Sequence, residues 1–337
     1  MRNPSALITG ITGQDGILLA QLLLDKGYEV VGFGRQASIS SKRADLQLLY
    51  KRIRLYYGDL GNSVDIVDAI QDVSPDEIYN LAAQSAPGLS WAQSIETGKV
   101  TGVGAHRIFE AVRQFNPECR VYHASTSEMF GNASKLPQNE GTPLRPLNPY
   151  AVAKVYAHHM AEIYRKSHDV FISCGILFNH ESVYRGMHFL TQKITYGAAC
   201  AKLGISDSEA LNEEGEPIVH RGKLSLGNLD ASRDWGHAKD YVRAMWLMLQ
   251  HSVADDFVIG TGISRSVRDF CAVAYAHVGE DWRDRVVSDP RFVRPIETMT
   301  TVADTSKARR ELGWAPSIPF ESVVGEMVDA HILALQG

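Results

Sequence analysis

The sequence has little of what marks secreted, membrane-spanning or zinc-binding proteins. Its 337 residues contain 4 cysteines, none in a C-x-x-C pair, which excludes a disulfide framework and a zinc finger. It has no run of about 20 apolar residues, and its first apolar stretch, residues 6–10, leads into a glycine turn instead of a cleavage site. These absences predict a soluble, cytoplasmic protein without a membrane partner, whose cysteines are buried as small hydrophobic side chains.

An excess of positive charge is also missing. Lys and Arg number 34 against 39 Asp and Glu, a formal net charge of −5, so the chain offers no basic field to a nucleic acid. Because 45% of the residues are hydrophobic, intrinsic disorder is excluded as well. At about 150 residues per domain the length fits roughly two domains or one large one, and the expected partner is a small molecule.

Motifs of hydrolases and metalloenzymes are absent too. Neither G-x-S-x-G nor H-E-x-x-H occurs in the sequence. His158 and His159 are adjacent in an expected helix, where neighbouring side chains point about 100° apart, so they are not expected to share a metal ion. We therefore expect no metal site.

What the sequence does contain is an alternation of two patterns. Short apolar runs end in glycine or polar residues, and stretches with apolar residues at helical spacing separate most of them. The expected strands are 6–9, 28–34, 53–57, 77–82, 120–125 and 171–177, and the clearest helices are 16–27, 101–115 and 151–168. This alternation predicts an α/β protein with a doubly wound parallel sheet of the Rossmann type.

The alternation breaks down after about residue 179. Residues 203–222 are polar, charged and glycine-bearing, which indicates a surface insertion with a mobile character. A helix at 240–250 and a strand at 257–260 then return to the first pattern. We predict a cofactor-binding domain of residues 1–178 plus about 237–262, and a smaller, interleaved C-terminal α/β substrate domain of about 179–236 plus 263–337.

A glycine fingerprint follows the first expected strand. Gly10, Gly13 and Gly16 form G-x-x-G-x-x-G, where glycine permits the tight turn, the approach of a pyrophosphate to bare backbone, and close packing of the following helix. Arg35 stands at the end of the second strand, where an enzyme using NAD carries an acidic residue on the ribose. With Lys42 and Arg43 nearby, it suits a 2′-phosphate, so NADP is the expected cofactor.

Four residues carry the expected chemistry. Tyr150 and Lys154 lie four positions apart, one above the other on a helix, and the ammonium is expected to lower the pKa of the phenol toward working pH. Thr126, at the end of the fifth strand, can bond the reacting alcohol. Glu128 adds a carboxylate that a simple alcohol oxidation does not need, which indicates a second proton transfer.

These segments, together with residues 124–131, 175–182, 225–241 and 244–249, resemble the GDP-mannose 4,6-dehydratases, a family of nucleotide-sugar-modifying extended short-chain dehydrogenases/reductases. The resemblance covers nearly the whole chain. It implies a lyase that oxidises C4 of the sugar, eliminates water across C5 and C6, and returns the stored hydride to C6. In this scheme Tyr150 takes the C4 hydroxyl proton, Thr126 holds that hydroxyl, Lys154 holds the nicotinamide ribose and Glu128 takes the C5 proton.

The resemblance also implies two sets of binding residues. Those expected at the cofactor are Gly10, Thr12, Gly13, Gln14, Asp15, Gly16, Arg35, Asp59, Leu60, Leu81, Ala82, Ala83, Gln84, Tyr150, Lys154, Leu177, His180 and Arg185. Those expected at the substrate are Ser85, Thr126, Glu128, Asn179, Glu181, Lys193, Arg233, Arg294 and Glu297, with Arg185 also near the nucleotide. The cations suit a diphosphate, and the carboxylates suit ribose hydroxyls or the guanine edge.

Some positions depart from the family pattern. Gln192 stands before Lys193 where the family frequently has an arginine, and Pro87, Tyr184 and the 203–222 insertion each bear on the shape of the sugar pocket. A related sugar such as GDP-manno-heptose therefore stays open as substrate. Two other classes remain as alternatives: an NADP-dependent nucleotide-sugar reductase or epimerase, against which Glu128 argues, and a non-catalytic NADP-binding regulator, which would be expected to lose catalytic residues. By resemblance we expect a homodimer or homotetramer, with residues 35–43 near a neighbouring subunit.

Overall fold

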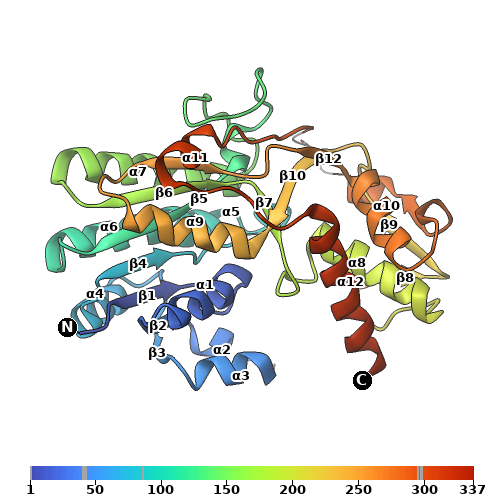
Figure 1. The fold of residues 1–337 in the computed structure, drawn as a ribbon, viewed down its shortest axis with the longest axis horizontal. Helices are drawn as coiled ribbons and strands as arrows, with labels where there is room; N and C mark the ends of the chain where they lie inside the picture. Colours follow the sequence, from blue (N-terminus) through green and yellow to red (C-terminus); the bar gives the residue numbers. More distant parts are fainter. Residues whose placement is uncertain (1, 40–43, 86, 294–295, 297–298) are drawn as a thin grey trace.

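A large parallel sheet organises the first half of the chain in the computed structural model, which describes residues 2–39, 44–85, 87–293, 296 and 299–337. Its strands are β1 (Ser5–Thr9), β2 (Glu29–Gly34), β3 (Arg54–Tyr57), β4 (Glu77–Asn80), β5 (Arg120–Thr126), β6 (Ile172–Leu177) and β11 (Asp256–Ile259). They lie in the order β11-β6-β5-β4-β1-β2-β3, and every neighbouring pair is parallel (Figure 1). The predicted Rossmann-type sheet is confirmed, with each expected strand within two residues of its place.

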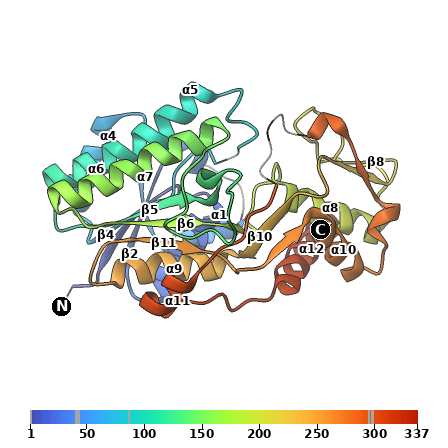
Figure 2. The same cartoon turned by 90° about the horizontal axis from the view of Figure 1, so that it is seen from above.

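Helices cover both faces of this sheet (Figure 2). One layer holds α1 (Gln14–Asp25), α3 (Ala44–Tyr50) and α9 (Ala238–Gln250); the other holds α4 (Ser63–Val73), α6 (Gly104–Phe115) and α7 (Pro149–His168). Alternate residues of a strand pack against opposite layers: Ala6 and Ile8 pack with the first, and Leu7 packs with the second. The expected helix at 101–115 is longer than predicted, because α5 (Ser94–Thr97) and a π-helical turn at Gly98–Val103 precede α6.

The second lobe is built from two small sheets and three longer helices. Its strands are β7 (Asn179–Glu181), β8 (Val219–His220), β9 (Lys223–Leu226), β10 (Ser232–His237), β12 (Ser264–Ser266) and β13 (Val286–Ser288), in the orders β12-β10-β7 and β13-β9-β8. The helices are α8 (Leu190–Leu203), α10 (Val267–His277) and α12 (Phe320–Gln336). Trp235, Phe270 and Phe320 pack edge to face in its core, with ring centres 5.2 and 5.4 Å apart.

The two lobes exchange segments more than once. After β10 the chain returns to the large sheet as α9 and β11, and it returns again as α11 (Ser306–Leu312). Ala308 and Trp314 are fully buried in the core of the large lobe, and the Trp314 indole donates a hydrogen bond to Asp240 O at 2.8 Å. The predicted division placed residues 263–337 together in the smaller domain, whereas these side chains pack with the larger one. The division itself stays a prediction.

The polar stretch at 203–222 is anchored at both ends. Gly204 ends α8 in a left-handed conformation, and Ser208, Ile218 and Val219 are buried in the second lobe. Between them, Leu211 and Pro217 form an isolated bridge that closes a turn with exposed charged residues. The expected insertion is thus a surface turn held by buried anchors. Across the described residues, no helix is both long and apolar enough to cross a membrane.

Candidate active site

The glycine turn between β1 and α1 is shaped for close backbone contacts. Gly10 has a φ of +73°, and a Cβ there would lie 2.8 Å from Ala82 N, at the end of β4. A Cβ on Gly16 would lie 2.4 Å from Gly10 O, so only glycine lets α1 start this close to the strand. Gly13 provides no side-chain cap for the helix. The bare turn and uncapped helix N-terminus fit a pyrophosphate, as the fingerprint predicts.

The turn lies where the strand order reverses. From β1 the chain runs outward through β2 and β3, then returns to the other side of β1 as β4, which is the point where ligands bind in sheets of this type. Thr9 Oγ1 joins the two strand ends: it accepts hydrogen bonds from Leu81 N and Ala82 N, both at 3.1 Å, and donates to Asn80 Oδ1 at 2.9 Å. Thr9 and Asn80 were not among the predicted residues; their signal was a polar residue ending an apolar strand.

The first turn of α1 is also tied to the second lobe. Gln14 Nε2 donates to His180 O at 3.0 Å, and its Oε1 accepts from the Ser182 hydroxyl at 2.9 Å. The buried His180 and the partly buried Asp15 form an ion pair at 2.9 Å. Burial opposes both charges, yet the pair outweighs it, so the pKa of Asp15 is lowered and the pKa of His180 is raised. These side chains bond each other; cofactor contacts by Thr12, Gln14, Asp15 and His180 stay predictions.

Thr126 and Tyr150 meet at the end of β5. Thr126 is the last residue of that strand, and Tyr150 stands in the first turn of α7; both are buried. Burial raises the pKa of Tyr150 and Glu128 raises it further, while a hydrogen bond from Thr126 and the charge of Arg185 oppose them. The expected lowering of the Tyr150 pKa is therefore wrong for the protein on its own, because desolvation dominates.

Lys154 lies one helical turn beyond Tyr150 and faces the strand backbone. Its Nζ donates to Ala124 O at 2.5 Å and lies 5.8 Å from the centre of the Tyr150 ring. Lys154 as a whole is 3% exposed, and burial lowers its pKa to about 8. The four-residue spacing predicted that the ammonium acts on the phenol. In the structure it instead donates to a carbonyl oxygen of β5, two residues before Thr126.

Glu128 lies two residues beyond Thr126, in a short helical turn (Ser127–Phe130) that Thr126 caps. Its N–H donates to Thr126 Oγ1 at 3.3 Å. Its Oε2 accepts a hydrogen bond from Asn148 Nδ2 at 3.0 Å. Asn148, the N-cap of α7, was missed from the sequence, because a cap residue gives no sign of what its other side touches. Thr126, Glu128, Tyr150 and Lys154 are thus brought together, as the sequence predicted.

The residues expected at the nucleotide that the structure describes mostly have partners within the protein. Glu181 accepts from the Thr191 hydroxyl at 2.8 Å and forms an ion pair with Arg185 at 3.2 Å. Lys193 is paired with Glu213 of the 203–222 turn, at 2.5 Å. Arg233 is buried and donates to backbone carbonyls, while its neighbour Asp234 accepts from Thr261, Gly262 and Ala303 instead. Arg294 and Glu297 lie outside the described residues. Their roles as substrate ligands stay predictions.

The remaining predicted residues border the sheet. Arg35 is exposed directly after β2, and Asp59 Oδ1 accepts a hydrogen bond from Gly61 N at 2.7 Å in the turn after β3. Residues 81–85 follow β4, with Gln84 N bonded to Thr101; Leu177 ends β6 and Asn179 begins β7. Leu60 lies in the apolar core, so only its backbone is available to a cofactor. Lys42 and Arg43 lie outside the described residues.

Of the departures from the family pattern, Gln192 lies in the interior. It is 2% exposed, its Nε2 donates to Ser182 O at 3.1 Å, and its Oε1 bonds His331 at 2.6 Å. The residue therefore joins α8 to α12 and to the loop after β7, so its difference from the family acts on packing inside the lobe.

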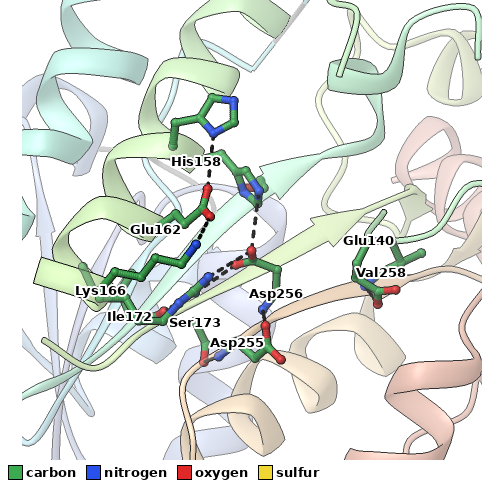
Figure 3. A network of polar contacts seen from close by, with 12 residues as sticks. Glu140, His158, Glu162, Lys166, Ile172, Ser173, Asp255, Asp256 and Val258 are labelled. Carbon is green, nitrogen blue, oxygen red and sulfur yellow. Dashed lines mark hydrogen bonds and ion pairs between the residues drawn. The ribbon is translucent and has the colours of Figure 1, made fainter. Parts of the chain in front are cut away.

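One group of metal-ligand side chains lies behind the site, within the described part of the chain. Ligand atoms of His158, Cys174 and Asp256 lie within 4.8 Å of one another. Asp256, however, receives two hydrogen bonds from Arg165, each at 3.0 Å, and Figure 3 shows His158 directed at the same carboxylate. Burial raises the pKa of Cys174 well above its ordinary value, which disfavours a thiolate ligand. The absence of a metal stays a prediction.

Comparison with known proteins gives this geometry a family. A family model described as GDP-mannose 4,6 dehydratase matches residues 7–327. The GDP-mannose 4,6 dehydratase of Homo sapiens is 41% identical over 97% of this chain and 91% of its own, and GDP-mannose 4,6 dehydratase 1 of Arabidopsis thaliana is 42% identical over 97% and 89%.

Solved structures show the same fold at lower identity. A dTDP-glucose 4,6-dehydratase from Streptomyces venezuelae, described with NAD, has a TM-score of 0.81 at 23% identity and covers 97% of this chain and 96% of its own. RMD from Pseudomonas aeruginosa, complexed with NADPH, has a TM-score of 0.78 at 18% identity, with coverage of 98% and 100%. Sequence identity over nearly the full length and a site with the expected catalytic residues in contact thus agree: this chain belongs to the GDP-mannose 4,6-dehydratase family.

Proposed function

We propose that this protein catalyses the NADP-dependent dehydration of GDP-mannose to GDP-4-keto-6-deoxymannose. The observation that carries the proposal is the meeting of Thr126 and Tyr150 with a second acid/base group, Glu128, at the end of β5. Alcohol oxidation alone needs one such group. A carboxylate held beside the pair supports elimination, and the family to which the chain belongs carries the name of that reaction.

The glycine turn, Arg35, Lys154 and the segment after β4 would hold the cofactor. When bound, the nicotinamide would accept the hydride from C4 and give it back at C6. Tyr150 would take the C4 hydroxyl proton, with the Thr126 hydroxyl orienting that oxygen. Because burial raises the pKa of Tyr150, the phenolate needs positive charge near it, and Arg185 supplies part of that charge.

Glu128 would act on the ketone. The 4-keto group acidifies the C5 hydrogen, and the Glu128 carboxylate takes that proton. The electron pair forms the C5–C6 double bond as the C6–O bond breaks, and the leaving hydroxyl, protonated by Glu128, departs as water. The same carboxyl group therefore accepts a proton from carbon and delivers one to oxygen, so it ends each elimination ready for the next. After the hydride returns to C6, C5 takes a proton that exchanges with solvent. Tyr150 gives up the proton it took from the C4 hydroxyl, so both groups end the cycle as they began it.

NADP, in preference to NAD, is supported by Arg35. Its guanidinium is exposed directly after β2, at the position where the ribose 2′ substituent lies in this fold. Arg35→Ala is expected to raise KM for NADP about tenfold or more and to change KM for NAD little, because only the 2′-phosphate pairs with an arginine. Equal changes for the two cofactors would contradict this assignment.

We infer further that the protein is a cytoplasmic homodimer or homotetramer. Its four cysteines are free and buried, which suits a reducing compartment. The helices α5, α6 and α7 pack together, and their outer faces expose Ile95, Phe115, Val152, Tyr156 and Ile163. Apolar side chains on adjacent helices suit a subunit interface. Sedimentation equilibrium tests this assembly, and a monomer at micromolar concentration would contradict it.

One assay tests the reaction. Purified protein is incubated with GDP-mannose and NADP in deuterated water, and the product is analysed by mass spectrometry and NMR. We expect the loss of one water molecule and one deuterium at C5. Glu128→Gln is expected to lower the rate of water loss by about 10²- to 10⁴-fold while the fold persists. Unchanged GDP-mannose with the wild-type protein would contradict the proposed function, and full activity of the variant would remove Glu128 from it.

A further inference from the structure

Asn148 makes two different contacts with the two ends of its carboxamide. Its Oδ1 accepts a hydrogen bond from Ala151 N at 2.8 Å and so caps α7, the helix that carries Tyr150 and Lys154. Its Nδ2 donates to Glu128 Oε2 at 3.0 Å. Because the oxygen is held by the helix, the nitrogen must face the other way, toward Glu128. One side chain thus ties Glu128 to the helix that carries Tyr150.

The backbone around Asn148 is held to the Glu128 turn independently of this contact. Arg145 N donates to Met129 O at 2.8 Å, directly after Glu128. Gly131 has a φ of +57°, and a Cβ on it would lie 2.0 Å from Arg145 O, so the two segments pass at a separation that only glycine permits. The chain entering α7 is therefore placed against the Glu128 turn by two contacts three residues before Asn148.

We propose that Asn148 is a positioning residue for Glu128: its N–H holds the carboxylate in a fixed orientation, in register with Tyr150, while the C5 proton is taken. A hydrogen bond from an amide N–H to a carboxylate oxygen fixes the orientation of the carboxylate. Anchoring the donor in the first turn of α7 gives Glu128 and Tyr150 a common frame, although they lie 22 positions apart in the sequence. The inference rests on the proposed function, because it assigns a partner to the base of that reaction.

The test separates this role from helix capping. Asn148→Ser and Asn148→Asp both keep a good N-cap for α7. The serine side chain is too short to replace the amide donor, and the aspartate places a second carboxylate beside Glu128. We expect Asn148→Ser to lower kcat about tenfold. We expect Asn148→Asp to move the acidic limb of the pH profile of kcat upward by about one unit, because two carboxylates that face each other repel when both are charged.

Isotope effects identify the step that changes. With GDP-mannose deuterated at C5, the isotope effect on kcat is expected to rise in both variants, and with C4-deuterated substrate it is expected to fall. Asn62→Asp is the matched control: Asn62 caps α4 through Val64 N at 3.0 Å and donates to Asp65 at 2.6 Å, a similar arrangement on an exposed helix. This control should leave the acidic limb and both isotope effects in place at saturating cofactor.

A double-mutant cycle completes the test. If Asn148 acts through Glu128, Asn148→Ser has little further effect on kcat in the Glu128→Gln background. Equal losses of kcat in both backgrounds would show that Asn148 acts only as a helix cap. The same conclusion would follow if the loss of kcat paralleled a fall in the thermal midpoint while the pH profile stayed unchanged. Failure of the wild-type protein to dehydrate GDP-mannose would instead refute the proposed function, so the two failures are distinguishable.

Discussion

Lys154 should make the protein less stable at neutral pH than an apolar residue would. It is 3% exposed, and burial lowers its pKa from the ordinary 10.5 to about 8. At about 1.4 kcal/mol per unit, this difference corresponds to roughly 3 kcal/mol of cost for the buried ammonium. Lys154→Met fills the same space without the charge. Allowing about 1 kcal/mol for the lost hydrogen bond to Ala124 O, we expect the variant to be about 2 kcal/mol more stable at pH 7.

The sign of the pH dependence follows from linkage. Below about pH 8 both states of the wild-type protein hold the Lys154 proton, and the folded state bears the full cost. Between about 8 and 10.5 the unfolded chain binds more protons than the folded one, so wild-type stability rises with pH. The advantage of Lys154→Met should therefore shrink from about 2 kcal/mol at pH 7 to near zero at about pH 9.5.

Urea unfolding followed by circular dichroism measures this difference directly. Wild-type and variant proteins are compared at each pH, so that contributions from other titrating groups cancel. Lys154→Met should also be inactive, because it loses the cation beside Tyr150, which would make it a stabilised but dead enzyme. A stability difference that does not change between pH 7 and 9.5 would show that Lys154 is not titrating with a lowered pKa, and would refute the reasoning.

Two further predictions concern the second lobe and the loop that leads to α7. Glu213→Gln should lower KM for GDP-mannose about threefold without changing kcat, because the half-exposed Glu213 carboxylate is expected to compete with the diphosphate for Lys193. A raised KM would mean that the ion pair between Lys193 and Glu213 orders the site instead. Gly131→Ala should destabilise the protein by more than about 2 kcal/mol, because its Cβ would meet Arg145 O and its φ is positive. Gly279→Ala, with a φ of +80° and open space around the Cβ, is its control and should cost about 1 kcal/mol in the same denaturation experiment.

Most of the fold and the position of the site could be predicted from local sequence patterns. Strands such as β1 and β6 are buried along their whole length and mostly apolar because helices cover both of their faces, so the apolar runs alone predicted them. The glycine turn could be predicted from the sequence because a Cβ at Gly10 or Gly16 would clash with neighbouring backbone atoms, so only glycine fits. Trp314 shows where such reading stops: an indole after a short helix gives no sign that it packs beneath α9, because that contact depends on how the chain returns to the large lobe.

The predicted direction of the Tyr150 pKa shift was wrong for a related reason. The four-residue spacing placed an ammonium on the same helix face as the phenol, but spacing does not reveal competing acceptors or depth of burial. Ala124 O, from a strand 26 positions before Tyr150, accepts the Lys154 hydrogen bond, and the closed surroundings of the phenol disfavour its charged form more than nearby cations favour it. A motif therefore identifies which groups react, whereas their protonation depends on partners supplied by other elements.

Charge pairing across the site follows the same logic. Asp15 with His180, Glu181 with Arg185, and Lys193 with Glu213 each join an acid to a base in or near the second lobe, so predicted ligand residues already have protein partners. A buried or half-buried charged side chain that lost its partner without gaining another would lose several kcal/mol of stabilisation. If Lys193 binds the diphosphate, as the sequence predicts, a phosphate instead takes the place of the Glu213 carboxylate. Binding then exchanges partners, and its affinity depends on the difference between Glu213 and a phosphate as ligands, which is the quantity that Glu213→Gln measures.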